Sequence, residues 1–272
     1  MLDWGMIDAF SSPQAPAATA LLLLASPFIG SFLATAVYRL PRGRSVAGMR
    51  SACPGCGHVL GPVDLLPLVG YLVRRGRCAH CNARISTLYP SIELAALAVA
   101  AWALAAAPGW TVVPVAALGW ALITLAAIDL RHFLLPDALT VPLLLLGIAL
   151  AAGGLDVSGI SWPIAFSDAL VGAASGFLSL ALIAWVYLRL RGRAGLGLGD
   201  AKLLAASGAW VGWQGLASVV LIAALAALAV SLALAAYKRR RPALGDRLPF
   251  GPYLALGTWL VVLYGPLSFR WF

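Results

Sequence analysis

The sequence predicts an all-α polytopic membrane protein of about eight transmembrane helices, with one small domain outside the membrane between the first and second helices. Three observations favour this fold class. Of the 272 residues, 62% are apolar and only 11% are charged, and the mean hydropathy is +0.92. Many apolar stretches approach the roughly 20 helical residues that cross a bilayer. A single polar segment is long enough to fold by itself.

The same composition excludes several classes of protein. Its apolar content rules out a disordered chain or collagen, and four cysteines in this length are too few for a secreted disulfide scaffold. The net charge of +9 could suggest nucleic acid, but the basic residues are dispersed among apolar runs. We therefore expect membrane lipid as a partner and no nucleic acid.

Hydropathy predicts seven or eight spans. The fourth and sixth are short, so an interfacial or re-entrant helix is an alternative for each. The predicted spans are residues 17–37, 89–107, 112–129, 138–152, 169–188, 201–213, 216–237 and 252–267.

Basic residues predict the orientation, because Lys and Arg in short loops stay on the cytoplasmic side. With the N-terminus outside, all of the 19 basic residues except Arg270 fall inside. The acidic segment before the first span is unlike a signal peptide, so that span is expected to remain as an anchor. The acidic residues expected on the outer side are Asp3, Asp8, Asp156 and Asp168.

This topology divides the chain into three parts. Residues 1–40 form the N-terminal transmembrane helix, residues 41–88 a cytoplasmic domain, and residues 89–272 a membrane-embedded core. All four cysteines lie in the cytoplasmic part. It is too small to build a sufficient core of its own.

The cysteines form two Cys-x-x-Cys pairs that 21 residues separate. Two such turns can direct four thiolates at one tetrahedral zinc ion, although the gap slightly exceeds the usual range. Four thiolates close the coordination sphere, so the zinc is expected to be structural. Two disulfides or a redox pair are the alternatives, which a cytoplasmic location disfavours. The ligands are Cys53, Cys56, Cys78 and Cys81, with Arg50, Arg77 and Arg84 favouring thiolates and His58 and His80 as bystanders.

Two aspartates carry the predicted chemistry. Asp129 ends the third span and Asp200 begins the sixth, so both lie at the cytoplasmic boundary of the bilayer. Two carboxylates at one depth can share a proton, with one as general base on a water and the other as general acid. This is aspartic-protease chemistry. Gly197 and Gly199 would let a substrate backbone approach Asp200.

Each of these residues also has a structural interpretation. Asp200 could cap a helix, Asp129 could pair with Arg131, and Asp137 could cap the fourth span. Lys202 is either a partner at the interface for a phosphate or for a substrate charge, or a snorkelling lysine. Spacing alone leaves these alternatives open.

A series of motifs resembles the bacterial type IV prepilin peptidases, bifunctional leader peptidase and N-methyltransferase enzymes. The resemblance covers nearly the whole chain in order. The matching segments are residues 30–33 (GSFL), 38–41 (YRLP), the two cysteine pairs with 75–78 (RGRC), 85–86 (IS), 89–93 (YPSIE), 128–130 (IDL), 135–140 (LPDALT), 197–203 (GLGDAKL) and 249–252 (PFGP).

The resemblance implies an intramembrane aspartic endopeptidase of the bacterial inner membrane. It would remove the basic leader from prepilins or pseudopilins after a glycine, then methylate the new N-terminus with S-adenosylmethionine. Carried onto this chain, the catalytic pair is Asp129 and Asp200, with Asp137 as the second choice. Asp64 is expected to order the zinc domain, and Glu93 to be an acid on the methyltransferase side.

One position departs from the family pattern, since Ala34 stands where the family usually has asparagine after GSFL. No residue pattern marks a methyl-donor site, so methylation is expected by analogy alone. Two other functions use similar features: a transporter or proton-coupled channel with membrane carboxylates, and a zinc-stapled assembly factor of a secretion machine.

Overall fold

A computed structural model of the chain describes residues 16–46, 51–53, 55–61, 63–107, 109–153, 164–192, 197–238 and 248–267. Several residues that bear on the predicted orientation and thiol chemistry lie outside this described part. They are Asp3, Asp8, Arg50, Asp156 and Arg270.

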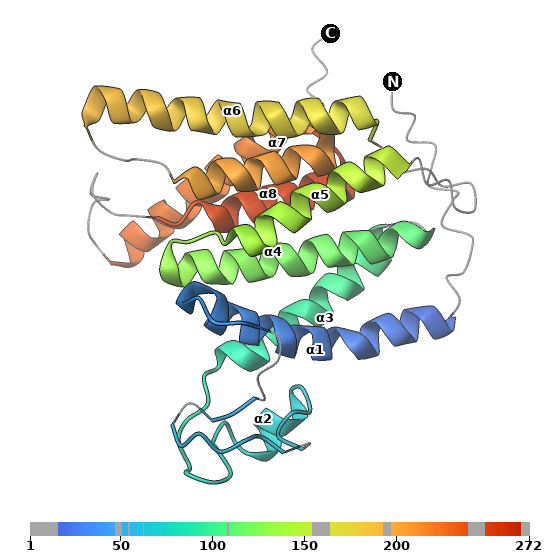
Figure 1. Cartoon of the computed structure of the whole chain (residues 1–272), viewed down its shortest axis with the longest axis vertical. Coiled ribbons are helices and arrows are strands. Elements are labelled where there is room, and N and C mark those ends of the chain that lie inside the picture. Colours follow the sequence, from blue (N-terminus) through green and yellow to red (C-terminus); the bar gives the residue numbers. More distant parts are fainter. Residues whose placement is uncertain are drawn as a thin grey trace. The chain divides into compact units, whose positions relative to one another are not determined.

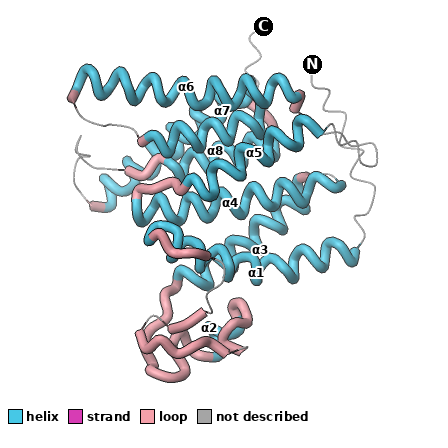
Figure 2. The backbone as a smooth tube through the Cα atoms, in the orientation of Figure 1, coloured by secondary structure: helices cyan, strands magenta, loops and turns pink. Residues whose placement is uncertain are grey.

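The described chain is helical, as Figures 1 and 2 show, and it contains no β-strand, only two isolated bridges. The predicted all-α class is therefore confirmed. The helices are α1 (Pro16–Arg39), α2 (Val69–Val73), α3 (Leu88–Ala106), α4 (Val112–His132), α5 (Asp137–Gly153), α6 (Phe166–Arg191), α7 (Leu198–Tyr237) and α8 (Gly251–Tyr264), with 3-10 turns at Leu40–Arg42 and Gly109–Thr111.

Five of these helices, α1, α3, α4, α6 and α7, are long and apolar enough to cross a membrane. Helices α5 and α8 are apolar but shorter. Helix α5 matches the short fourth span of the sequence prediction. The predicted sixth and seventh spans are both in α7, whose helical geometry breaks at Gly212 with φ 68° and ψ 173°. Since only glycine adopts such a conformation readily, Gly212 separates two helical segments.

The chain forms two compact units, residues Met1–Thr124 and Leu125–Phe272. In the first unit, α1 packs against α3. Gly30 makes this contact close, because a Cβ there would lie 2.6 Å from the Cα of Glu93. Small residues at such crossings let membrane helices approach. The first unit also contains the cysteine segment.

The second unit is built around the first segment of α7, which is almost completely buried from Ala201 to Gly212. Helices α5, α6 and α8 pack against α7. A Cβ at Gly172 or Gly208 would collide with the backbone of the other helix, so α6 and α7 touch through backbone atoms. The Trp210 indole donates a hydrogen bond of 2.8 Å to the Leu143 carbonyl oxygen, which joins α7 to α5.

A buried polar contact joins α7 to α8. The hydroxyls of Ser207 and Thr258 lie 2.6 Å apart, so one donates to the other, and the accepting hydroxyl donates to the carbonyl oxygen one turn earlier in its own helix. Such hydrogen bonds between helices are effective where no water competes. The first segment of α7 is thereby fixed at the centre of the second unit, and Asp200 stands at its N-terminal end.

Candidate functional site

Asp129 lies near the C-terminal end of α4 and is buried, with 5% of its surface exposed. Its carboxylate accepts a hydrogen bond of 3.0 Å from the backbone N–H of Gly251, the first residue of α8. A helix N-terminus carries partial positive charge, which favours a negative group there. Asp129 forms no ion pair with Arg131, so within the described chain the structural alternative for this aspartate does not hold.

Asp200 is the third residue of α7 and is half-buried. It does not occupy the cap position, which is Gly197. Its backbone N–H donates to the Gly197 carbonyl oxygen at 3.2 Å, and its side chain lines the same cavity as Asp129. Asp200 therefore lies at the N-terminal end of α7, and the carboxylate of Asp129 lies at the N-terminal end of α8.

The two aspartates line one cavity of about 290 Å³ within the second unit. The turn between α4 and α5, residues 133–136, forms one wall. Phe133 closes α4 with a positive φ of 52°, and its N–H bonds to the carbonyl oxygen of Asp129 at 2.9 Å. A left-handed residue commonly ends a helix in this way. The turn thus follows directly from Asp129 and leads to Asp137.

Asp137 and Lys202 form an ion pair at this cavity. The Lys202 ammonium lies 2.7 and 2.9 Å from the two carboxylate oxygens of Asp137. The pair links the first turn of α5 to the first turn of α7 and therefore joins the two aspartate motifs. Asp137 is bonded to Lys202 rather than serving only as a helix cap.

The two predicted glycines differ in their surroundings. Position 199 has little room for a side chain, because a Cβ there would lie 3.1 Å from the Leu135 Cβ. Gly197 is exposed, and a Cβ there would come no nearer than 3.8 Å to a neighbouring atom. Only Gly197 therefore leaves space beside Asp200 that another chain could use.

The sequence did not predict the role of α8 in this cavity. A Cβ at Gly251 would lie 2.7 Å from a carboxylate oxygen of Asp129 and 3.2 Å from Leu135. The available signal was the motif Pro249–Pro252, which resembles the family but carries no ionisable side chain. Every residue except proline has a backbone N–H, so the sequence does not show which of them donates to Asp129.

A second cluster lies in the first unit, where the four predicted cysteines come together. Their Sγ atoms all lie within 4.8 Å of one another, and those of Cys53 and Cys81 are 3.8 Å apart. Tetrahedral zinc with Zn–S bonds near 2.3 Å requires sulfur separations of about 3.8 Å. The cluster therefore fits a four-thiolate metal site.

The two cysteine pairs fold into equivalent knuckles. Gly57 N–H bonds to the Cys53 carbonyl oxygen, and Asn82 N–H bonds to that of Cys78. Both donors have positive φ, 71° and 59°, which glycine and asparagine tolerate best. The backbone N–H of His80 also donates to the Cys78 sulfur at 3.4 Å.

The geometry of the knuckles favours a thiolate at Cys78. Backbone N–H groups of Cys81 and His80 lower the pKa of the Cys78 thiol to about 6, which favours a thiolate ligand. The rings of His58 and His80 stack on each other with centroids 4.7 Å apart and do not join the cysteine cluster.

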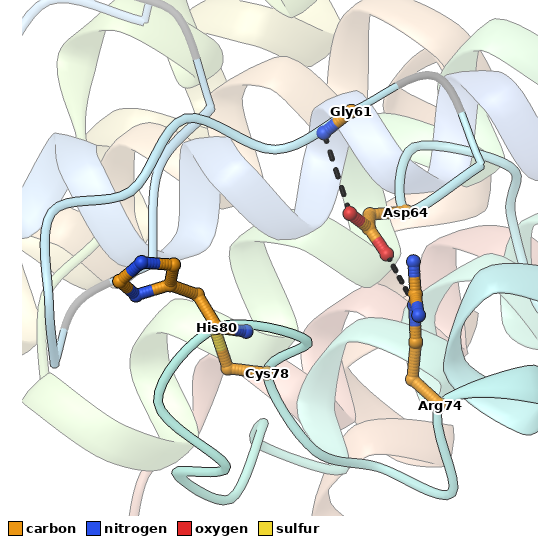
Figure 3. Close-up of polar contacts among 5 residues, drawn as sticks. All are labelled: Gly61, Asp64, Arg74, Cys78 and His80. Carbon is orange, nitrogen blue, oxygen red and sulfur yellow. Dashed lines mark hydrogen bonds and ion pairs between the residues drawn. The ribbon is translucent and has the colours of Figure 1, made fainter.

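Two further predicted acids also lie in the first unit. The Asp64 carboxylate is 2.7 Å from the Arg74 guanidinium and accepts a 3.3 Å hydrogen bond from Gly61 N–H (Figure 3). The Arg74 hydrogen bond lowers the pKa of Asp64 below its ordinary value. Glu93 is buried in α3, and its carboxylate accepts a 2.8 Å hydrogen bond from the backbone N–H of Leu68.

Together, fold and site define a class: a multi-pass helical membrane protein with a paired-aspartate cavity and a four-cysteine cluster that could hold a metal ion. Comparison with known families agrees. Residues 24–107 match the bacterial peptidase A24 N-terminal domain, and residues 116–232 match the type IV leader peptidase family. The chain belongs to the type IV leader peptidase family.

Curated relatives extend the similarity over most of the chain. A prepilin leader peptidase/N-methyltransferase of Aeromonas hydrophila is 37% identical over 93% of this chain and 92% of its own length. Proteins of the same name from Burkholderia pseudomallei strain 1026b and Pseudomonas aeruginosa are 38% and 36% identical, covering 96% and 89% of this chain and 90% and 89% of their own lengths. No solved structure matches the chain significantly.

Proposed function

We propose that the protein is an intramembrane aspartic endopeptidase that removes the basic leader peptide from type IV prepilins or pseudopilins and then N-methylates the new N-terminus. The single observation that carries the peptidase activity is the cavity shared by Asp129 and Asp200. The substrate class is that named for the relatives.

In this mechanism the two carboxylates share one proton, because two neighbouring carboxylates in a poorly hydrated site do not both ionise. The ionised carboxylate takes a proton from a water in the cavity as the water oxygen attacks the scissile carbonyl carbon. The protonated carboxylic acid donates its proton to the carbonyl oxygen. The first aspartate then gives the proton taken from the water to the amine nitrogen, and the second carboxylate takes a hydroxyl proton from the tetrahedral intermediate as the C–N bond breaks, so the pair again holds one proton.

Several neighbours support the two carboxylates. The N–H of Gly251 holds the Asp129 carboxylate, and the open side of Gly197 admits the substrate backbone beside Asp200. The pair Asp137–Lys202 acts as a positioning element, because it fixes the turn after Asp129 against the start of α7.

The proposed membrane is the bacterial inner membrane, with the N-terminus outside and residues 41–88 as a cytoplasmic domain. The distribution of basic residues supports this orientation, since the loops that would be cytoplasmic carry nearly all of them. It also supports the proposed substrate, since a basic leader would stay in the cytoplasm while the apolar part of the pilin remains in the bilayer. The remaining domain, residues 89–272, would be the peptidase core.

We propose zinc as the metal of the cysteine cluster, held by Cys53, Cys56, Cys78 and Cys81. When bound it supplies no catalysis, because four thiolates fill the coordination sphere, and it stabilises a segment without a large core.

S-adenosylmethionine is proposed as methyl donor from the names of the relatives. The Glu93 carboxylate, predicted as an acid on the methyltransferase side, is buried and accepts the hydrogen bond from the Leu68 N–H. Its part in methyl transfer stays a prediction.

The test incubates the purified protein with a prepilin and S-adenosylmethionine and follows leader loss by gel and the product mass by mass spectrometry. We expect Asp129→Asn and Asp200→Asn each to lower the cleavage rate by about 10²–10⁴-fold, the range for loss of an acid or base. The matched control is Asp168→Asn, an aspartate of the same unit whose carboxylate bonds to Trp213 and Gln214. The control should cleave normally.

Cleavage at the full rate by either the Asp129→Asn or the Asp200→Asn variant would contradict the proposed catalytic pair. Cleavage without the mass of one methyl group on the product would remove methylation and leave the peptidase. If folded protein cuts none of several prepilins, but loses partner binding on Cys53→Ser, the assembly-factor interpretation would replace the proposal.

A further inference from the structure

Residues 63–73, a loop that ends in the short helix α2 and precedes the second cysteine pair, expose an apolar surface that the proposed function does not use. Between residues 63 and 73, six apolar side chains are 42–72% exposed. The lipid-facing residues of α1 in the same unit, such as Leu24 and Phe28, are 57–70% exposed. The loop is thus about as apolar and open as a membrane-facing helix, although it lies outside the spans. Its exposed residues are Val63, Leu65, Leu66, Val69, Leu72 and Val73.

This arrangement is fixed by polar contacts inside the loop. Figure 3 shows Asp64 between Gly61 N–H and the Arg74 side chain, so the two ends of the loop are tied to one carboxylate. Gly70 is buried against the backbone, because a Cβ there would lie 2.8 Å from the Val63 carbonyl oxygen. These contacts hold the two ends of the loop together, while its apolar side chains stay exposed. A large exposed apolar patch marks an interaction surface.

Glu93 sets the depth of the loop. Leu68, at the centre of the loop, has a positive φ of 60°, and its N–H donates to the Glu93 carboxylate at 2.8 Å. Glu93 is the sixth residue of α3, which begins at Leu88 and is a candidate membrane span. Five residues of helix rise about 8 Å. Interfacial segments bury their apolar side about 5–10 Å into the boundary between headgroups and acyl chains.

We propose that residues 63–73 form an interfacial loop that inserts its apolar side chains into the lipid bilayer crossed by α1 and α3, with anionic headgroups as the partners of the flanking arginines. Arg75, Arg77 and Arg84 follow the loop and are exposed. Arginine near a membrane surface is attracted to anionic headgroups while its aliphatic stem lies along apolar surface. Charge and apolar surface therefore point to the same partner.

The test measures the depth of single nitroxide labels in the full chain, reconstituted into phosphatidylethanolamine–phosphatidylglycerol bilayers. The label is attached to a genetically encoded keto amino acid, which leaves the four cysteines unmodified. It is placed at Val73 and, as a matched control, at Val59, an exposed valine within the first cysteine knuckle. Unchanged zinc content in both labelled proteins verifies that the cysteine segment is folded.

We expect the label at position 73 to be more accessible to membrane-dissolved oxygen than to a water-soluble nickel reagent, and the label at position 59 to show the reverse. In pure phosphatidylcholine the difference should shrink, because the arginines lose their anionic partners. Equal access to nickel at both positions would overturn the proposal. Shielding of position 73 from both reagents would overturn it as well, since a protein surface would then cover the loop. Neither outcome depends on peptidase activity.

Discussion

The two aspartates of the cavity are held in different ways. The Asp129 carboxylate accepts a hydrogen bond from Gly251 of another helix, whereas the backbone N–H of Asp200 donates to Gly197, the residue that precedes its own helix. Asp129 is also the more buried of the two. The position of Asp129 therefore depends on the packing of α8, and that of Asp200 on the start of α7.

The Asp137–Lys202 pair is expected to matter for activity more than for stability. The Lys202 and Asp137 side chains are 40% and 61% exposed, and solvent-exposed pairs contribute only about 0–1 kcal/mol. We expect Lys202→Gln to lower the cleavage rate about 10-fold while the unfolding temperature changes little. A displacement of about 1 Å at a reacting group can cost 10²-fold in rate. Prepilin cleavage and thermal unfolding of the same detergent samples measure both effects.

The matched control is the exchange of the two charges. Asp137→Lys combined with Lys202→Asp keeps the attraction and should restore part of the activity that either single variant loses. If the exchanged protein is no better than the single variants, a specific contact of Lys202 would replace the positioning role.

Asp64 predicts a dependence of local stability on pH. Arg74 lowers the pKa of the Asp64 carboxyl in the folded protein. The contact between them therefore stabilises fully above the ordinary carboxyl pKa near 4, and this stabilisation is lost as the pH falls through the lower pKa of the folded state. We expect Asp64→Asn to destabilise residues 61–74 by less than about 1 kcal/mol, because Arg74 is partly exposed. Amide exchange, corrected for intrinsic rates, should show a difference between Asp64→Asn and the unchanged protein that is constant between pH 8 and 5 and shrinks as the pH falls below about 4.

Arg74→Gln is the control for this interpretation, and it should give the same constant difference. A difference that grows toward pH 8 would show that another group titrates, and the assignment to Asp64 would be wrong.

At the scale of helices, backbone contact between α6 and α7 holds the second unit together. In an exposed helix, Gly→Ala stabilises by about 1 kcal/mol. At Gly172 the opposite is expected, because the added Cβ collides with the backbone at Gly208. We expect Gly172→Ala to destabilise the protein by about 1–3 kcal/mol, the usual cost of overpacking. Thermal unfolding in detergent measures this change.

Ser179→Ala on the same helix is the control, since Ser179 is exposed and its hydroxyl donates only to the Gly176 carbonyl oxygen. It should change stability little. If Gly172→Ala were as stable as this control, the two helices would have room to separate, contrary to the contact described.

The sequence predicted most helices because the length of an apolar stretch can be counted directly along the chain. The α5 span was expected within a few residues, and the two predicted spans on either side of position 214 correspond to the segments of α7. The break between these segments falls at Gly212 because of a backbone angle, which no hydropathy profile contains. The cysteine cluster was predictable because ligand spacing is local.

The candidate site was only partly predictable. Ionisable residues at membrane boundaries identified Asp129 and Asp200, yet their packing partners are apolar or backbone groups. Leu135 fills the space beside Gly199, and Gly251 donates to Asp129. Neither contact involves a side chain with distinctive chemistry, so only the three-dimensional arrangement reveals them.

For the molecule as a whole, the two sites lie in different units, the cysteine cluster in the first and the aspartate cavity in the second. Removal of the metal by a chelator should therefore unfold the knuckles locally. Structural zinc contributes on the order of 10 kcal/mol in small domains. We expect amides of residues 51–84 to lose protection from exchange while those of α6 and α7 keep it.

Cys53→Ser should reproduce the effect of the chelator on these amides and on bound zinc. Asp200→Asn, which leaves the cysteines intact, should retain both. Loss of protection in α6 and α7 on chelation would show that the second unit depends on the metal, contrary to this expectation.

The hydrogen bond from Gly251 to Asp129 has a consequence for synthesis of the protein. The ribosome makes both aspartates well before it makes α8. The first segment of α7, which carries Asp200, has 14 residues and is about 21 Å long, so it is shorter than the hydrocarbon core of a bilayer. A nascent chain that lacks α8 holds neither the backbone donor for Asp129 nor the Thr258 partner of Ser207. The paired-aspartate cavity is therefore completed only after α8 has been made. A partly synthesised chain in the translocon does not yet contain the complete cavity.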